Sequence, residues 1–563
     1  MAPSDSFEME NLVDRLSQQN ISSQARTRYV SRTEALLNDA LPALQVDPFT
    51  LPQHQWRESS QPVRNATGSI LSLYHLLLAV WETSDLAAVA IPFTRRVWFQ
   101  LVAWTEFIHP ANKYIDNPSH SSDAIAAIIL GELVAHRSQL SDLLAQTPRV
   151  YRLLADSWLH GDKRWFSHKT ALFDRNPLEL YGRIVKVVMQ ALTGDRGPPG
   201  TAPPMLEGIL EATNHRPKRI YKRAMACLMV AAQPSAYSAQ IVSSQLTIIF
   251  TLASDLLPLA SYPRNVIRSL VRWATDLKKG PQGKDLTLAY RVVECMWLSA
   301  QDDRPLVWAL RDGIMPLMMA ANQHLNYELS RGLELMMRRS IFVPVARALA
   351  SCETNFEIWA DPQANTILND TIKERLLFVP LLDGEQCSNP QCGKTAGDGT
   401  RLSRCPCLAM TYYCSVECQK AHRPAHQRIC HIDPLLRIHQ ILDKIRAHPI
   451  GLSQVQFMRC NGVQYTRHHG LNILAEIDQF IPPDSSLVCV FQITIDFEQL
   501  PSPSHTTFVA DPESEELYPF LHDLDEHEVV AVARLSSDVS VVSFTYTLTQ
   551  LRELVLEDYR QGH

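Results

Sequence analysis

Seven of the chain's twelve cysteines lie within 44 residues, from Cys387 to Cys430. An even spread would put about one cysteine in a stretch of that length, so sulfur is concentrated here for a chemical reason. Disulfides persist in oxidising compartments, whereas the N-terminal sequence MAPSDSFEMENLVDRLSQQN lacks the basic segment and apolar run of a secretory signal. We therefore expect a cytoplasmic or nuclear chain whose clustered cysteines bind metal, with zinc as the leading candidate.

The potential ligands form four pairs at short spacing. Zinc takes four nitrogen or sulfur donors in a tetrahedron, and pairs separated by loops supply them economically. Donors four residues apart lie on one side of a helical turn, and donors two apart lie on one side of an extended segment. Eight ligands predict two zinc ions, from these pairs: Cys387 and Cys392, Cys405 and Cys407, Cys414 and Cys418, His426 and Cys430.

Two short helices are expected to carry the last two pairs. Ser415 is suited to cap the first turn of one helix, because its side chain can accept a hydrogen bond from a free backbone N–H. Pro424 suits the first turn of a second helix, where its missing N–H would have no partner in any case. Cys405 and Cys407 flank Pro406 in an extended segment.

The order of these motifs resembles the MYND-type zinc finger, and a long helical region before the finger is similar to the layout of fungal proteins of this type. The resemblance is carried by CSNPQC, YYCSVECQK and HQRIC, which cover less than a tenth of the chain. In that family the first and third pairs hold one zinc ion and the second and fourth pairs hold the other. The resemblance therefore implies one site at Cys387, Cys392, Cys414 and Cys418, and a second at Cys405, Cys407, His426 and Cys430.

Two departures from the family pattern affect these expectations. Only Pro406 separates the cysteines of the second pair, where the family usually has two residues. The Asp-Trp that usually follows the Cys-Gln segment is replaced by His422 and Arg423. His422 and His431 therefore stay rivals of His426 as the nitrogen ligand.

The net charge of the chain and the full coordination of the predicted zinc ions by protein limit the expected function. A formal net charge of -6 offers no basic footprint for phosphates, so we expect protein partners and not nucleic acid. A zinc ion whose four positions are all filled by protein is structural. We therefore expect no enzymatic activity. The resemblance implies a protein-interaction or scaffold module, often found in transcriptional or signalling complexes.

A lysine methyltransferase of the SET-and-MYND type is the enzyme alternative. That family carries an Asn-His-Ser-Cys segment after the finger and a glycine-rich cofactor segment before it. Neither is present: no Asn-His-Ser-Cys follows the finger, and the preceding NDTIKERLLFVPLLDGEQ lacks the glycine pattern. A nucleic-acid-binding regulator is a further alternative, which the finger's mild excess of Lys and Arg favours only weakly.

The elements before the finger predict a mostly α-helical fold. Leu286, Ala289, Val293 and Met296 recur at steps of three and four, which places them on one side of a helix. We expect a solenoid-like array of helix pairs, inferred from helix density because no fixed-period repeat is found. Residues 224–254 carry no charge but too many polar residues for a lipid-exposed span. We interpret them as two buried helices and expect no membrane association.

After the finger, the sequence predicts one more helix and then a small α+β unit. PLLRIHQILDKIRAH has the helical pattern, and SSLVCVFQITIDF, HEVVAVARL and VSVVSFTYTLT read as strands before a closing helix in LTQLRELVLEDY. We interpret YTRHHG, with His468 and His469, as a surface turn, and DPESEELYPFLHDLDEHE as a solvated acidic loop. The expected domains are a flexible segment 1–22, a helical domain 23–382, the finger 387–430, and a C-terminal helix plus α+β unit 431–563.

Overall fold

The computed structural model divides the chain into two compact units, Met1–Pro305 and Leu306–His563. The residues that the structure describes are 3–16, 21–80, 84–115, 120–164, 177–194, 202–233, 238–277, 283–318, 330–352, 371–379, 387–395, 400, 402–404, 411–427, 452–481, 489–497, 499, 503–510, 527–536 and 539–560.

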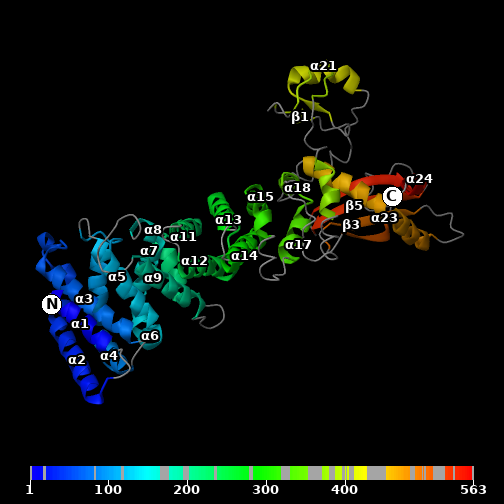
Figure 1. The fold of residues 1–563 in the computed structure, drawn as a ribbon. Coiled ribbons are helices and arrows are strands. Elements are labelled where there is room, and N and C mark those ends of the chain that lie inside the picture. The colour runs from blue at the N-terminus through cyan, green and yellow to red at the C-terminus, as the bar shows by residue number, and fades with distance from the viewer. Residues whose placement is uncertain are drawn as a thin grey trace. The chain divides into compact units, whose positions relative to one another are not determined.

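The first unit is built of helices (Figure 1). They are α1 (Pro3–Leu16), α2 (Ser23–Gln45), η1 (Pro48–Thr50), η2 (Gln53–Gln55), α3 (Gln61–Ala79), α4 (Ser84–Ile108), α5 (His120–Ala135), α6 (Arg137–Gln146), α7 (Arg149–Leu159), α8 (Gly161–Arg164), α9 (Pro177–Thr193), α10 (Pro204–Ala212), α11 (Pro217–Ala231), α12 (Ala239–Thr251), η3 (Leu252–Leu256), α13 (Arg264–Leu277) and α14 (Gly283–Ser299).

Most of these helices pack against helices that are close to them in the sequence. Helices α1, α3, α5, α9, α12 and α14 each contact the next in this order, while α2 contacts α4, α7 contacts α10 and α11, and α11 contacts α13. Each helix buries its apolar side between its neighbours, and the indoles of Trp98, Trp104 and Trp158 are fully buried. An array of this kind is stabilised by contacts between successive elements. The prediction of a mostly helical array is confirmed.

Two helices of this array contact at unusually short range because of a glycine. A Cβ atom at Gly208 of α10 would lie 2.6 Å from the backbone carbonyl carbon of Tyr151 in α7. No larger residue fits there without moving one helix.

Helix α1, inside the segment 1–22 that was expected to be flexible, contacts α2 and α3 and buries Met9 and Leu12.

Two apolar stretches of the first unit have the length of a membrane span. The described residues of the uncharged stretch 224–254 form the second half of α11, then α12 and the start of η3, all largely buried, so the interpretation as two buried helices is confirmed. Among the described helices, one segment, Leu86–Ile108 of α4, is long and apolar enough to cross a membrane by length and composition. It contacts α2, α3 and α5, and core helices of soluble proteins pass the same test.

The second unit contains a four-stranded sheet in the order β4-β3-β5-β6, in which β3 and β5 are parallel and the other neighbours antiparallel. Outside the finger its elements are α17 (Ser330–Arg339), α18 (Val343–Ala350), α23 (Leu452–Phe480), β3 (Val490–Asp496), β4 (Ser504–Ala510), β5 (Glu528–Ser536), β6 (Val539–Thr547) and α24 (Leu548–Arg560), with α15 (Arg304–Arg311) at the boundary between the units. The predicted α+β unit with three strands and a closing helix is confirmed, and β4 is a fourth strand that we did not foresee. The helix predicted in PLLRIHQILDKIRAH and most of the acidic loop lie outside the described residues.

Residues on both sides of the finger in the sequence share one hydrophobic core. Ile341 and Val343 pack in a single cluster with Phe457 of α23 and with apolar residues of β3 and β5. The side chain of Gln454 joins the same segments, because its amide nitrogen donates to the Ile341 carbonyl at 2.6 Å and its oxygen accepts from the Val343 N–H at 2.8 Å. The finger is thus inserted into a unit whose two halves fold together, while the sequence-based domain boundaries stay predictions.

A buried arginine holds these two halves together. Arg375 is 2% exposed, and its guanidinium donates to the carbonyls of Met337 and Phe497 and to the Ser340 hydroxyl. The group also lies over the Phe497 ring, 5.5 Å from its centroid. Burial lowers the pKa of Arg375 to about 9, so the side chain stays charged at neutral pH. One side chain therefore donates hydrogen bonds both to a carbonyl in the last turn of α17 and to a carbonyl directly after β3.

The interpretation of YTRHHG as a surface turn is wrong, because His468 and His469 lie within α23. The glycine at the end of this segment, Gly470, serves helix packing. A Cβ atom at Gly470 would lie 2.2 Å from Cγ2 of Val555 in α24, so only glycine allows this approach of the two helices.

We expect the Arg375→Met variant to lose local stability in the second unit. Removal of the guanidinium leaves the Phe497 carbonyl without its hydrogen bond from Arg375, and an unsatisfied buried acceptor costs about 1–3 kcal/mol. The Met337 carbonyl loses one of its donors but still accepts from Ser340. Hydrogen–deuterium exchange should then accelerate at least about tenfold in α17 and β3. Amides of α4 in the first unit serve as the internal control, and unchanged exchange in β3 would contradict this role of Arg375.

Candidate metal centre

The finger is organised by a two-stranded sheet and one helix. Strand β1 (Ser403–Arg404) pairs antiparallel with β2 (Tyr412–Tyr413), and helix α21 (Val416–His426) follows β2 after two residues. The small core contains Cys387 and Tyr413, with Leu402 and three further cysteines packed against it. So few apolar side chains leave little hydrophobic stabilisation, and bound metal is the usual substitute in domains of this size.

The first cysteine pair lies on a turn that backbone hydrogen bonds define. The N–H of Cys387 donates to the Lys394 carbonyl at 2.8 Å, and the N–H of Cys392 donates to the Asn389 carbonyl at 2.9 Å. Gly393 completes the turn with a φ of +65°, a conformation that favours glycine. The sequence CSNPQCG thus folds back on itself and turns both sulfurs toward the same region.

The third pair is placed by the start of α21. Cys414 directly precedes the cap residue Ser415, whose side chain accepts from the Cys418 N–H at 3.3 Å. The predicted cap at Ser415 is confirmed. The prediction that Pro424 begins a second helix is wrong, because Pro424 lies inside α21, in its last turn. Proline is accommodated there because residues 421–426 form the short end of the helix, which is exposed apart from the half-buried His422 and the buried His426.

Four sulfur atoms meet where these two segments join. The Sγ atoms of Cys387, Cys392, Cys414 and Cys418 all lie within 4.8 Å of one another. Cys392 Sγ is 3.3 Å from Cys414 Sγ, which in turn is 3.5 Å from Cys418 Sγ. All four belong to free cysteines. The structure thus brings together the four residues of the first site that the resemblance implies, and this donor set fits a tetrahedral thiolate site for zinc.

Proximity of the thiols governs their ionisation. A hydrogen bond with the Asn389 side chain lowers the pKa of Cys418 to about 7. Hydrogen bonds with Cys392 and Cys418 raise the pKa of Cys414 to about 12. One thiolate forms readily, whereas further negative charge among such close sulfurs is opposed by repulsion. A cation at the centre removes this opposition, since thiolate is the metal-binding form of cysteine.

The second predicted site falls largely outside the described residues. Cys405, Cys407, Cys430 and the rival ligand His431 are not among them, whereas His422 and His426 are. Neither histidine belongs to the four-sulfur cluster. His426 is buried, with both ring nitrogens 3.4 Å from the Thr411 hydroxyl. His422 has its Nδ1 atom 3.0 Å from the hydroxyl of buried Tyr413, a hydrogen bond that gives this ring a role without metal.

Three residues that support the site were not identified from the sequence. Ser388 links the first pair to β2, because its N–H donates to the Tyr412 carbonyl at 2.7 Å and its hydroxyl accepts from the Tyr412 N–H at 2.9 Å. Asn389 contacts the Cys418 thiol, and Tyr413 holds His422. Ser388 and Asn389 could have been identified from their position between the two cysteines of CSNPQC, because a polar side chain at that position lies near a metal-bound sulfur.

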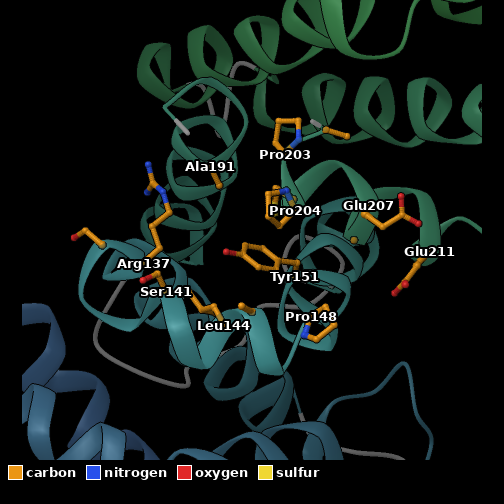
Figure 2. Close-up of a pocket in the computed structure, with 15 residues that line it drawn as sticks. Arg137, Ser141, Leu144, Pro148, Tyr151, Ala191, Pro203, Pro204, Glu207 and Glu211 are labelled. Atoms are coloured by element: carbon orange, nitrogen blue, oxygen red, sulfur yellow. The ribbon is translucent and has the colours of Figure 1, made fainter. Parts of the chain in front are cut away.

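The first unit contains a cavity of about 700 Å³ bordered by α6, α7, α9 and α10 (Figure 2). Tyr151 lies at its centre, with Arg137 on one side and Glu207 and Glu211 on the other. Its volume falls in the range of small-molecule sites. The lining residues include neither histidine nor cysteine, and we assign no chemistry to this cavity.

Comparison with known proteins agrees with the geometry of the finger. Residues 387–430 match the family model of the MYND finger. No curated protein and no solved structure matches the chain. The matched segment contains the four-sulfur cluster and all eight predicted ligands. The chain therefore carries a zinc-binding MYND finger at residues 387–430.

Proposed function

We propose that this chain is a zinc-dependent protein-interaction or scaffold protein of the cytoplasm or nucleus, in which the finger is structural and binds two zinc ions. The single observation that carries the proposal is the cluster of four cysteine sulfurs within 4.8 Å. Four protein ligands fill every position of a tetrahedral zinc ion and leave none for water or substrate. The resemblance to MYND fingers supports protein partners, with transcriptional or signalling complexes as the expected setting.

We propose that the chain is not an enzyme. The methyltransferase alternative shares one feature with the structure, since the finger interrupts the core of the second unit. The Asn-His-Ser-Cys and glycine-rich segments of that family are missing from the sequence, and function depends on the site and not on the arrangement of domains. A methyltransferase assay on histone peptides tests this point, and cofactor-dependent methylation would refute it.

The metal content is the first test. We expect two zinc ions per chain, because eight ligands in four pairs fill two tetrahedra. Chelation should unfold the finger and leave the first unit's helices intact, since the array has a core of its own. Elemental analysis measures the stoichiometry and far-ultraviolet circular dichroism measures helix content. One zinc ion per chain or none, or loss of most of the helix signal on chelation, would show the proposal to be wrong.

Substitution of single ligands is the second test. Cys414→Ser should lose one zinc ion, because serine is a poor ligand among thiolates. His422→Ala is the matched control and should keep both ions, whereas His426→Ala should lose the ion of the second site. Native mass spectrometry counts the ions in each variant. Metal loss in His422→Ala but not in His426→Ala would reverse the choice between the two histidines.

The binding preference of the finger is the third test. Arg423 is exposed on α21 at the position where relatives have the tryptophan that packs against proline-containing peptides. We expect the natural protein to bind a proline-rich peptide weakly or not at all, and Arg423→Trp to bind it at least about tenfold more tightly. Calorimetric titration measures both affinities. Sub-micromolar binding by the natural protein would contradict this expectation and would identify the finger as the main docking surface.

A further inference from the structure

Positive charge is concentrated in one part of the first unit. Helices α11 and α13, together with the residue directly before α11, carry eight Lys and Arg residues and one acidic residue, Asp276 near the end of α13, although the whole chain has an excess of acidic residues. Such a local reversal of sign produces a surface potential that attracts anionic groups. The eight cationic residues are Arg216, Lys218, Arg219, Lys222, Arg223, Arg264, Arg268 and Arg272.

Seven of these residues lie on α11 and α13, two helices that contact each other, and the eighth directly precedes α11. Arg216 precedes α11, four of the others lie on α11, and three lie on α13. The two helices are joined at a tyrosine pair: the ring centroids of Tyr221 and Tyr262 are 5.2 Å apart in an edge-to-face arrangement. The Tyr221 hydroxyl also donates to the Leu257 carbonyl at 2.8 Å. Because Tyr221 lies in the first half of α11 and Tyr262 is two residues before α13, the contact brings the starts of the two helices together.

The cations recur at helical spacing on the sides of both helices that do not enter the core. Lys218 and Lys222 are four residues apart and exposed. Arg264, Arg268 and Arg272 are also spaced by four, the first and last exposed and the middle one half-buried. The remaining positions of these helices provide the apolar contacts, among them Ile220, Tyr221, Val266, Ile267 and Leu270, all buried.

Among the residues that the structure describes, five of these cations have no acidic partner, whereas other cations of this unit do. Arg95 pairs with Asp142, Arg149 with Glu106 and Arg304 with Asp302. Within the part of the chain that the structure describes, no ion pair involves Arg216, Lys218, Arg219, Lys222 or Arg264. Repulsion between unpaired cations on two adjoining helices slightly lowers the stability of the fold. A bound anionic partner would remove this repulsion and add attraction.

We propose that the basic surface of α11 and α13 binds an acidic helix of a partner protein. Residues four apart on a helix are separated by about 6 Å along its axis, so carboxylates at the same spacing on a second helix match the rows Lys218–Lys222 and Arg264–Arg268–Arg272. Guanidinium groups bind carboxylates through two parallel hydrogen bonds. The inference rests on the proposed interaction function but places the docking surface on the helical unit and not on the finger.

A nucleic acid fits this surface less well. Single strands are held by stacking of bases on exposed aromatic rings, whereas the described aromatic residues of α11 and its contact with α13, Tyr221 and Tyr262, are fully buried, and Trp273 is 6% exposed. The net charge of the chain also opposes long polyanions. An acidic helix presents few charges over a short length and avoids this repulsion.

Fluorescence polarisation on the full-length protein tests the proposal. The probe is a labelled helical peptide of roughly twenty residues with Glu at every fourth position, about 30 Å long. We expect Lys218→Glu/Lys222→Glu to weaken binding at least about tenfold and Lys218→Gln/Lys222→Gln to weaken it less. The matched control is Arg28→Glu/Lys186→Glu, which makes the same charge change at exposed sites of α2 and α9 and should alter the affinity less than about twofold.

Three outcomes would overturn the proposal: no saturable peptide binding, equal weakening by the control variant, or tighter binding of a single-stranded RNA of the same charge. Binding that persists unchanged from about 0.1 to 1 M salt would also contradict it, because the screening length falls from about 10 Å to 3 Å over that range. Cys414→Ser should bind the peptide as the natural protein does. That result separates a failure of this surface from a failure of the finger.

Discussion

Repulsion among closely spaced thiolates is the constraint on which the finger depends. Cys387, Cys392, Cys414 and Cys418 cannot all ionise within 4.8 Å unless a cation shares the space. In the described part of the finger little apolar core compensates for this repulsion, since Cys387 and Tyr413 are the buried residues of its cluster. Metal binding and folding of this segment are therefore one process, as in other small zinc domains. The hydrogen bonds of Ser388 and Ser415 then fix the two segments that carry the sulfurs.

The finger is inserted in the sequence between two segments that share the core of the second unit. The chain enters from a segment held by Arg375 and returns to α23, and both belong to the core of the second unit. A segment tied at both ends loses less entropy when it folds than a free one does. The first unit has a separate core, so the binding that we propose for its basic surface does not require zinc.

The features that were predicted correctly depend on local chemistry. Ligand spacing identified the cysteine pairs, and the resemblance to MYND fingers implied which pairs share a site. Ser415 identified the start of α21, and apolar periodicity identified the helical array. The errors came from residues whose role is set by tertiary contacts. Gly470 has the appearance of a turn residue, but its lack of a side chain serves the contact with Val555. Strand β4 directly follows a proline-rich run, which made the strand pattern of its sequence hard to recognise. Pairing with β3 along its whole length stabilises it. Arg375 gave no signal, because nothing in the local sequence shows that Phe497 lies beside it.

The central claim is that cysteine sulfur forms the inner coordination shell of resident zinc. X-ray absorption at the zinc edge of the purified protein measures that shell directly. The account predicts a shell dominated by sulfur at a Zn–S distance of about 2.3 Å, with a minor nitrogen contribution from the second site and no bound water. A shell dominated by oxygen and nitrogen at about 2.0–2.1 Å would contradict it, because zinc would then be bound outside the cluster of Cys387, Cys392, Cys414 and Cys418.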